Sequence, residues 1–207
     1  MSNIAIKGAT TGTGVFTLES PATNTDRTLV LPDEAGTVLT TAGVPASAMP
    51  AGSVLQVVHG AYTSQQTLSP GSSWAEVTGL SATITPSSAT SKILVSASIN
   101  ASGSTSNYVV TFRLYRNGSY IEVSPNNSLR PGTFITIGAQ QWNNYFRYQA
   151  TGVYLDSPAS TSSLTYKLYT RDTRDNGVVF INSGYYDENG ASNPVGYSSI
   201  TLMEIAA

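Results

Sequence analysis

The 207-residue chain contains no cysteine, one histidine and few charged residues. Without cysteine there can be no disulfide, thiolate nucleophile or cysteine-based metal site. Because His59 is the only histidine, a multi-histidine metal centre is excluded. A Ser-His-Asp triad would have to be built on this residue. We interpret His59 as a packed or surface imidazole, and we expect no metal and no cofactor.

Charged residues make up 11% of the chain, and the formal net charge is −2. This composition gives no basic footprint for a polyanion, so no nucleic-acid partner is expected. The sequence also lacks a run of about eighteen apolar residues and an apolar stretch near its start, which argues against membrane insertion and a secretory signal. These absences suit a cytosolic protein. They equally suit a virion protein that is made in the bacterial cytoplasm and leaves the cell by lysis.

Small polar residues are abundant instead: Ser and Thr together supply 54 residues, beside 18 Gly, 13 Asn and 12 Tyr. This composition is typical of a β-rich protein whose surface carries hydroxyls and amides. Disorder is the competing interpretation, but a hydrophobic content of 40% and the low net charge argue against it.

Aromatic residues divide the chain into two parts. Residues 1–50 contain a single aromatic, Phe16, and the other eighteen all follow His59. Between them, residues 42–52 carry two prolines, two glycines and small side chains, which is typical of an extended linker. We therefore expect an N-terminal segment with its linker at 1–50 and a second domain at 51–207.

The second domain alternates apolar and polar residues with a period of two, which indicates β-strands. An Asn-Gly pair at 117–118 predicts a hairpin turn with positive φ at both positions, and Gly152, where the apolar parity switches, predicts a β-bulge. The clearest inward-facing sets are Ile93, Val95, Ala97 and Ile99; Tyr108, Val110, Phe112 and Leu114; and Leu164, Tyr166 and Leu168.

Such runs number roughly eight to ten, at the spacing typical of a β-sandwich or jelly roll, with almost no helix. The predicted fold class is therefore all-β. A short-stranded N-terminal stalk is followed by a C-terminal antiparallel β-sandwich of jelly-roll type.

Residues 14–41 read as three very short strands separated by turns, with few large apolar side chains. Strands with so little apolar surface cannot bury a core of their own. We therefore expect them to close against further copies of the chain or against another protein. The candidate trimer or anchor contacts are Phe16, Leu18, Leu29, Leu31 and Leu39.

Two clusters of aromatic and amide residues are candidates for recognition. Sugars are bound by ring faces against their C–H groups and by amides against their hydroxyls, and rings with a polar handle are also favoured at protein interfaces. Packing in the core or in a subunit contact is the competing role for these rings. The candidate receptor-binding residues are Trp142, Asn143, Asn144, Tyr145, Tyr185, Tyr186 and Asp187.

Carboxylate pairs are the remaining catalytic option, because glycoside cleavage needs two carboxyl groups at a suitable separation. Asp and Asn tolerate left-handed backbone, so those near 175 and 187 are better explained as turn residues. We therefore expect no enzyme and assign no catalytic residue. The acidic residues considered are Asp156, Asp172, Asp175, Asp187 and Glu188.

Four short motifs occur in order in the N-terminal segment: GVFTL at 14–18, PA at 21–22, RTLVLP at 27–32 and AGTVLT at 35–40. Together they resemble a module of bacteriophage tail-fibre and related virion proteins, including those of cyanophages and other marine phages. That family's pattern is a Gly-Thr start, Pro-Ala, Thr-Leu-Thr-Leu-Pro and Gly-Thr-Leu. Residues 84–95 and 199–205 are also similar in composition to the globular tip domains that follow such modules.

The resemblance implies a homotrimeric virion appendage. Its N-terminus would be anchored to another virion protein, and its β-rich knob would bind the host surface, with a glycan as the expected ligand. The chain has no long shaft, unlike typical tail fibres, which favours a short fibre or a decoration of the head or neck. A short tailspike glycanase and a cellular lectin are the two competing functions.

Overall fold

The computed structural model describes residues 11, 13, 24–26, 48–104, 109–128, 130–138, 147–172, 177–184 and 195–207. Contacts divide the chain into two units, Met1–Leu39 and Thr40–Ala207, and nearly all the described residues belong to the second. The domain boundary expected near residue 50 stays a prediction.

The described part of the chain contains eleven strands and no α-helix, slightly more strands than the sequence pattern predicts. Several are too short to be recognised by alternation. The strands are β1 (Val54–Tyr62), β2 (Gln66–Leu68), β3 (Ala75–Ile84), β4 (Lys92–Gly103), β5 (Val109–Arg116), β6 (Ser119–Tyr120), β7 (Ile135–Gly138), β8 (Tyr148–Asp156), β9 (Leu164–Asp172), β10 (Val179–Ile181) and β11 (Ser198–Ile205).

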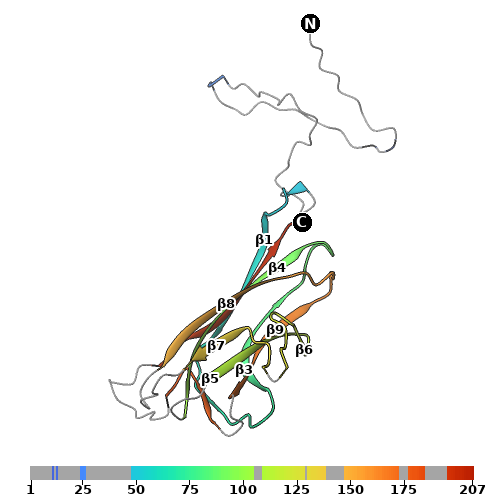
Figure 1. The fold of residues 1–207 in the computed structure, drawn as a ribbon. Helices are drawn as coiled ribbons and strands as arrows, with labels where there is room; N and C mark the ends of the chain where they lie inside the picture. Colours follow the sequence, from blue (N-terminus) through green and yellow to red (C-terminus); the bar gives the residue numbers. More distant parts are fainter. Residues whose placement is uncertain are drawn as a thin grey trace. The chain divides into compact units, whose positions relative to one another are not determined.

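The strands form two antiparallel sheets (Figure 1). In the six-stranded sheet the order is β1-β11-β4-β10-β2, and β8 pairs with the other edge of β4. In the five-stranded sheet the order is β3-β9-β5-β6, and β7 also pairs with β5. One of the sheets is curled into a half-barrel. The predicted all-β class, built on antiparallel sheets, is thus confirmed.

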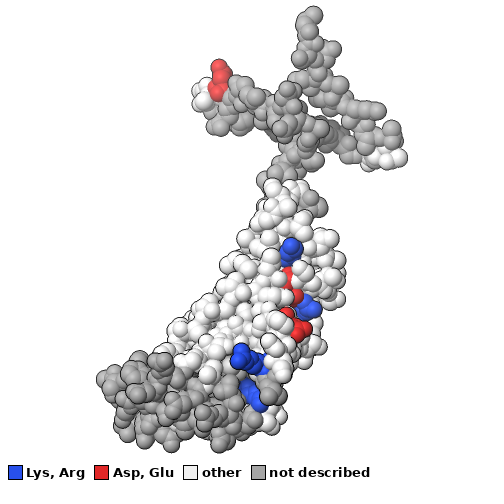
Figure 2. Space-filling model, viewed as in Figure 1, with Lys and Arg blue, Asp and Glu red and all other residues white. Residues whose placement is uncertain are grey.

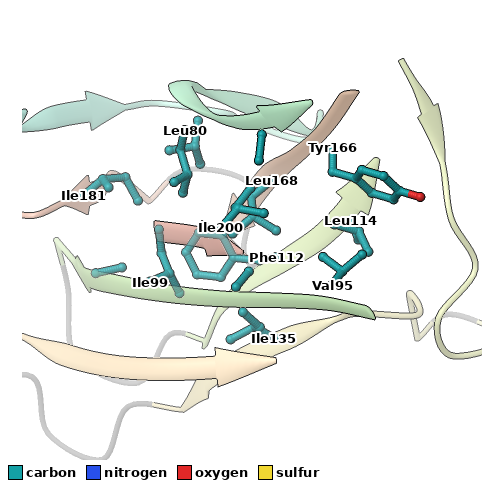
Figure 3. Packing of buried hydrophobic residues seen from close by; sticks show 14 of the residues in the cluster. Leu80, Val95, Ile99, Phe112, Leu114, Ile135, Tyr166, Leu168, Ile181 and Ile200 are labelled. Carbon is teal, nitrogen blue, oxygen red and sulfur yellow. The ribbon is translucent and has the colours of Figure 1, made fainter. Parts of the chain in front are cut away.

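One hydrophobic core lies between the sheets (Figure 3). It is filled by the alternate side chains that the period-two pattern selects, because successive residues of a strand point to opposite faces. All the described members of the predicted inward sets are buried, and Tyr108 lies outside the described residues. The other strands add Leu80, Ile84, Ile135, Ile181, Ile200 and Leu202.

The Asn-Gly hairpin is confirmed between β5 and β6. Asn117 has a φ of 49° and Gly118 a φ of 80°, as a type I′ turn requires. Arg116 and Ser119 pair directly across the turn.

The β-bulge predicted at Gly152 is wrong. β8 pairs with β4 without any shift from Tyr148 to Asp156. Val153 and Leu155 do not return to the core after a bulge; their side chains are exposed. The glycine has a different role, because a Cβ atom there would lie 2.7 Å from Cγ1 of Ile135. It lets β7 and its flanking residues approach β8, where the two sheets meet along one edge.

The sheets also meet along the opposite edge, where β1 lies beside β3. A Cβ atom on Gly60 of β1 would lie 2.0 Å from the backbone carbonyl oxygen of Ser81 on β3. Since backbone cannot move aside as a flexible side chain can, only glycine permits this approach. Both edges of the domain are therefore closed by a glycine that faces the other sheet.

We expect Gly60→Ala to lower the free energy of unfolding by about 2 kcal/mol, because the added methyl group forces β1 away from β3. The matched control is Gly138→Ala at the end of β7, where a Cβ atom meets nothing within 4 Å. That control is expected to change the free energy by less than about 1 kcal/mol. Urea denaturation of both variants measures the difference, and equal midpoints would contradict the proposed closure.

Candidate functional site

The linker and the C-terminus meet at one end of the domain, here called the linker end. The N–H of Gly52 donates to the carbonyl oxygen of Ala206 at 2.8 Å, and the N–H of Ala206 donates to the carbonyl oxygen of Ser53 at 2.9 Å. These two bonds extend the β1–β11 pairing beyond its last ladder pair. The residues that lead into β1 are therefore hydrogen-bonded to the residue that follows β11.

A buried carboxylate closes the core at the linker end. Glu204 on β11 points inward and is 0% exposed. It accepts hydrogen bonds from the N–H and Oγ of Ser87, at 2.7 and 2.6 Å, and from Nε2 of Gln56 at 2.6 Å. Burial alone would raise the pKa of Glu204, but these hydrogen bonds outweigh it and hold the pKa below its usual range. One side chain thus joins β11, β1 and the turn after β3.

A cavity of about 350 Å³ lies beside this carboxylate. Its lining carries no charged side chain and consists of short hydroxyl side chains and apolar groups: Met49, Leu55, Ser87, Ser88, Thr90, Ser91, Ala206 and Ala207. Such a lining offers neither an acid–base pair nor a metal-ligand set.

Strand ends gather at the opposite end of the domain, here called the far end. Gly103 at the end of β4 pairs with Val179 at the start of β10, and Gly138 at the end of β7 pairs with Val109 at the start of β5. Segments 105–108, 139–146 and 173–176 connect strand ends here and lie outside the described residues. So does segment 185–194. All the predicted receptor-binding residues fall in two of these segments: Trp142, Asn143, Asn144, Tyr145, Tyr185, Tyr186 and Asp187.

A buried asparagine holds the strands at the base of segment 185–194. Asn182 is 0% exposed and has a φ of 56°. Its Nδ2 donates to the carbonyl oxygens of Tyr62 and Ser64, at 2.9 and 3.0 Å, and its Oδ1 accepts from Oγ of Ser198 at 2.7 Å. Both polar atoms of the Asn182 side chain therefore have hydrogen-bond partners. The amide links β1, β10 and β11 without leaving a buried polar group unsatisfied.

The outer side of the five-stranded sheet carries half-buried aromatic rings and paired charges. Two rows of directly paired residues cross it, Glu76–Tyr169–Arg113 and Lys167–Tyr115–Tyr120. We call this surface the aromatic face. Its members are Trp74, Glu76, Arg113, Tyr115, Tyr120, Lys167 and Tyr169.

The rings of the aromatic face are held by direct contacts. Tyr115 and Tyr169 stack with their centroids 3.9 Å apart. The guanidinium carbon of Arg113 lies 4.3 Å from the ring centroid of Trp74 and 4.2 Å from that of Tyr120. Nε of Arg113 also donates to a backbone carbonyl, that of Gly132, at 2.9 Å, and its second terminal nitrogen donates to a neighbouring amide oxygen. The rings and the cation therefore form one preorganised surface.

A carboxylate sits beside this stack. Nζ of Lys167 lies 2.7 Å from one oxygen of Glu76, and the hydroxyl of Tyr169 donates to the other at 3.0 Å. The hydrogen bond from Lys167 is the main cause that lowers the pKa of Glu76, so the carboxylate is ionised at neutral pH. In the view of Figure 2, the visible charged side chains of the domain lie along one side, and the rest of its visible described surface is uncharged.

The single histidine is a surface imidazole, as expected. Nδ1 of His59 lies 2.9 Å from Oγ1 of Thr201, and Nε2 lies 2.8 Å from the hydroxyl of Tyr197. Both ring nitrogens thus contact hydroxyl groups rather than a carboxylate, so the geometry of a Ser-His-Asp triad is not met.

Among the acidic residues considered for catalysis, Asp156 makes buried contacts within the fold. It is 5% exposed, forms an ion pair with Arg116 and accepts a hydrogen bond from the hydroxyl of Tyr166 at 2.6 Å. Burial, and after it the bond to Asp156, raise the pKa of Tyr166. The side chains of Asp172, Asp175, Asp187 and Glu188 lie outside the described residues.

The described residues contain no group of three or more His, Asp or Glu side chains placed to hold a metal ion. No helix in the same part of the chain is long and apolar enough to cross a membrane. The predicted contacts at Phe16, Leu18, Leu29, Leu31 and Leu39 all lie outside the described residues and stay predictions. No family model and no curated protein matches the chain.

We expect Glu204→Gln to lower the free energy of unfolding at pH 7 by about 2 kcal/mol, because hydrogen bonds to a charged acceptor are lost. The pKa of Glu204 is lower in the folded chain than in the unfolded one, where it is about 4.3. Its contribution is therefore complete above the unfolded pKa and is lost as the pH falls through the folded pKa. Urea denaturation should show that the difference in the free energy of unfolding between wild type and variant becomes smaller as the pH falls through that window.

Glu122→Gln is the matched control, because Glu122 is exposed and makes one long contact, 3.4 Å, with the N–H of Asn126. The free energy of unfolding of Glu122→Gln is expected to differ little from that of wild type at every pH. A gap for Glu204→Gln that stays constant from pH 7 to pH 3 would contradict the role assigned to the carboxylate.

Proposed function

We propose that this chain is a non-enzymatic fibre protein of a phage virion, anchored by its N-terminal segment, whose β-domain attaches to glycans on the host surface. The aromatic face is the observation that carries the attachment. Within this proposal the chain assembles as a homotrimer, and its location on tail, neck or head does not alter the attachment chemistry.

The composition of the aromatic face supports glycan binding. Aromatic rings offer flat apolar surface to the C–H groups of a sugar, and their hydroxyls, a carboxylate and a guanidinium offer hydrogen bonds to its hydroxyl groups. Because Tyr115 and Tyr169 already stack on each other, and Arg113 already lies over the ring of Tyr120, few rotamers need to be fixed on binding. Such preorganisation suits weak, repeated contacts that gain avidity from several copies.

The arrangement of the ends also supports this proposal. The linker joins the domain at the linker end, through Gly52 and Ser53. The predicted receptor-binding segments leave from strand ends on the far half of the domain. A domain held at one end presents the other to its target, so the loop residues at 142–145 and 185–187 stay candidates that act beside the aromatic face.

The test is binding of the full chain to a printed array of bacterial lipopolysaccharides and capsular polysaccharides. We expect wild type to bind members of the array, and Tyr115→Ala/Tyr169→Ala to weaken the signal at least about tenfold. Thr83→Ala, an exposed outward position on β3 of the same sheet, is the matched control and should bind as wild type does.

The unfolding midpoint of each variant is measured alongside, so that loss of binding is separated from loss of fold. Wild-type binding that survives the double substitution would remove the aromatic face from the proposal. Absence of binding to every polysaccharide would contradict glycan attachment, and new reducing ends in the same incubation would favour a tailspike glycanase instead.

A further inference from the structure

The outer side of the six-stranded sheet carries an apolar row that crosses four strands. Val57 on β1 pairs with Met203 on β11, Met203 pairs with Leu94 on β4, and Leu94 pairs with Leu155 on β8. The neighbours of all four residues along their strands point into the core, so these four side chains point outward. Val153, two residues before Leu155, widens the row on β8.

The row is open to solvent at both ends. Val57 is 57% exposed, Val153 60% and Leu155 46%, and these are three of the few large hydrophobic side chains exposed on the described surface. Scattered exposed apolar residues are ordinary, but a contiguous set aligned across four strands marks an interaction surface.

Charge is nearly absent from this side of the sheet. The next rows are His59–Thr201–Ser96–Val153 and Ala61–Ser199–Ser98–Thr151, which bear hydroxyls and one imidazole. Of the outward positions paired in β1, β11, β4 and β8, only Lys92, at one end of β4, carries a formal charge. We call this surface the apolar face. In Figure 2 the surface is uncharged where β8 lies in Figure 1.

The flat area of the apolar face approaches that of a stable protein–protein contact. Four strands spaced about 4.8 Å apart, with about 3.3 Å per residue along the outward stretch of β4, give a flat footprint of roughly 19 by 30 Å. This is roughly 570 Å² before the relief of the side chains is added, against about 800 Å² per partner in a standard interface.

We propose that the apolar face packs against a second copy of this chain, so that the β-domain itself contributes to self-association. This inference rests on the proposed fibre function, but it assigns a contact to the β-domain that the N-terminal candidates do not include. A partner with a charged surface would lose hydration there without gaining a counter-charge. The same face of another copy brings apolar and hydroxyl groups only.

The row is apolar from β1 to β8, so equivalent rows of further copies can meet in a closed cyclic assembly. The aromatic face belongs to the other sheet and therefore stays accessible when the apolar faces meet. Self-association and glycan binding thus use different surfaces and can be tested separately.

The test is light scattering of the full chain after size-exclusion chromatography, over a range of loading concentrations. We expect wild type to have a mass that is a multiple of 21.7 kDa. In Val57→Glu/Leu155→Glu the self-dissociation constant should rise at least about 100-fold, because each copy would bring two charges into the contact. Both positions are exposed in the single chain, so the circular dichroism of the variant should match wild type. Its unfolding midpoint should also match when both proteins are diluted until wild type dissociates.

Thr78→Glu/Thr83→Glu, at two exposed positions on β3, adds the same charge to the other sheet and should keep the wild-type mass. A wild-type monomer, or an unchanged mass in Val57→Glu/Leu155→Glu, would overturn the inference. An oligomer that survives that change but is lost in Phe16→Asp would assign the contact to residues 1–50. That outcome would overturn the inference while leaving the proposed trimer intact, and failure on the polysaccharide array alone would count only against glycan attachment.

Discussion

Each strand that lines the core must turn every second side chain outward, and this constraint shapes every surface of the domain. Inward positions hold Ile, Val, Leu and a few rings packed between two sheets. The outward positions are occupied by the remaining residues of a chain that has few charged side chains and many hydroxyl groups. Because the same strands supply the core and the surfaces, the register that buries Val95 and Phe112 also decides which residues meet on each outer face.

The two sheets carry different residues on their outer faces. The five-stranded sheet carries the Glu76–Lys167 ion pair and the rings on either side of Arg113, whereas the six-stranded sheet carries an apolar row among hydroxyls. Polar rings suit a hydrated, polar ligand, and uncharged apolar surface suits removal from water. The proposed self-association and the proposed attachment therefore use different sheets and do not compete for one surface.

Local patterns predicted those parts of the fold that depend on neighbouring residues alone. Alternation identified the buried sets of β4, β5 and β9, and Asn117-Gly118 identified a turn whose φ values it makes possible. The prediction at Gly152 failed because it assumed that Val153 and Leu155 must be buried, whereas the register leaves them exposed. The aromatic face was missed altogether. Its rings come from β5, β6, β9 and the residue before β3, and only strand pairing shows that they are neighbours.

Glu204 was missed although the sequence held a signal for it. It continues the inward parity of Ile200 and Leu202 on β11, so a charged residue stands where the pattern requires an apolar one. A well-packed apolar residue at this position could give the fold as much stability as the hydrogen-bonded carboxylate, but the carboxylate also disfavours strand registers in which its hydrogen bonds are lost. A shift of β11 by one residue would exchange Glu204 with Met203, placing a charge on the apolar face and a thioether among the donors of Ser87 and Gln56. The hydrogen bonds inside the linker end therefore also fix the register that keeps Met203 in the apolar row outside.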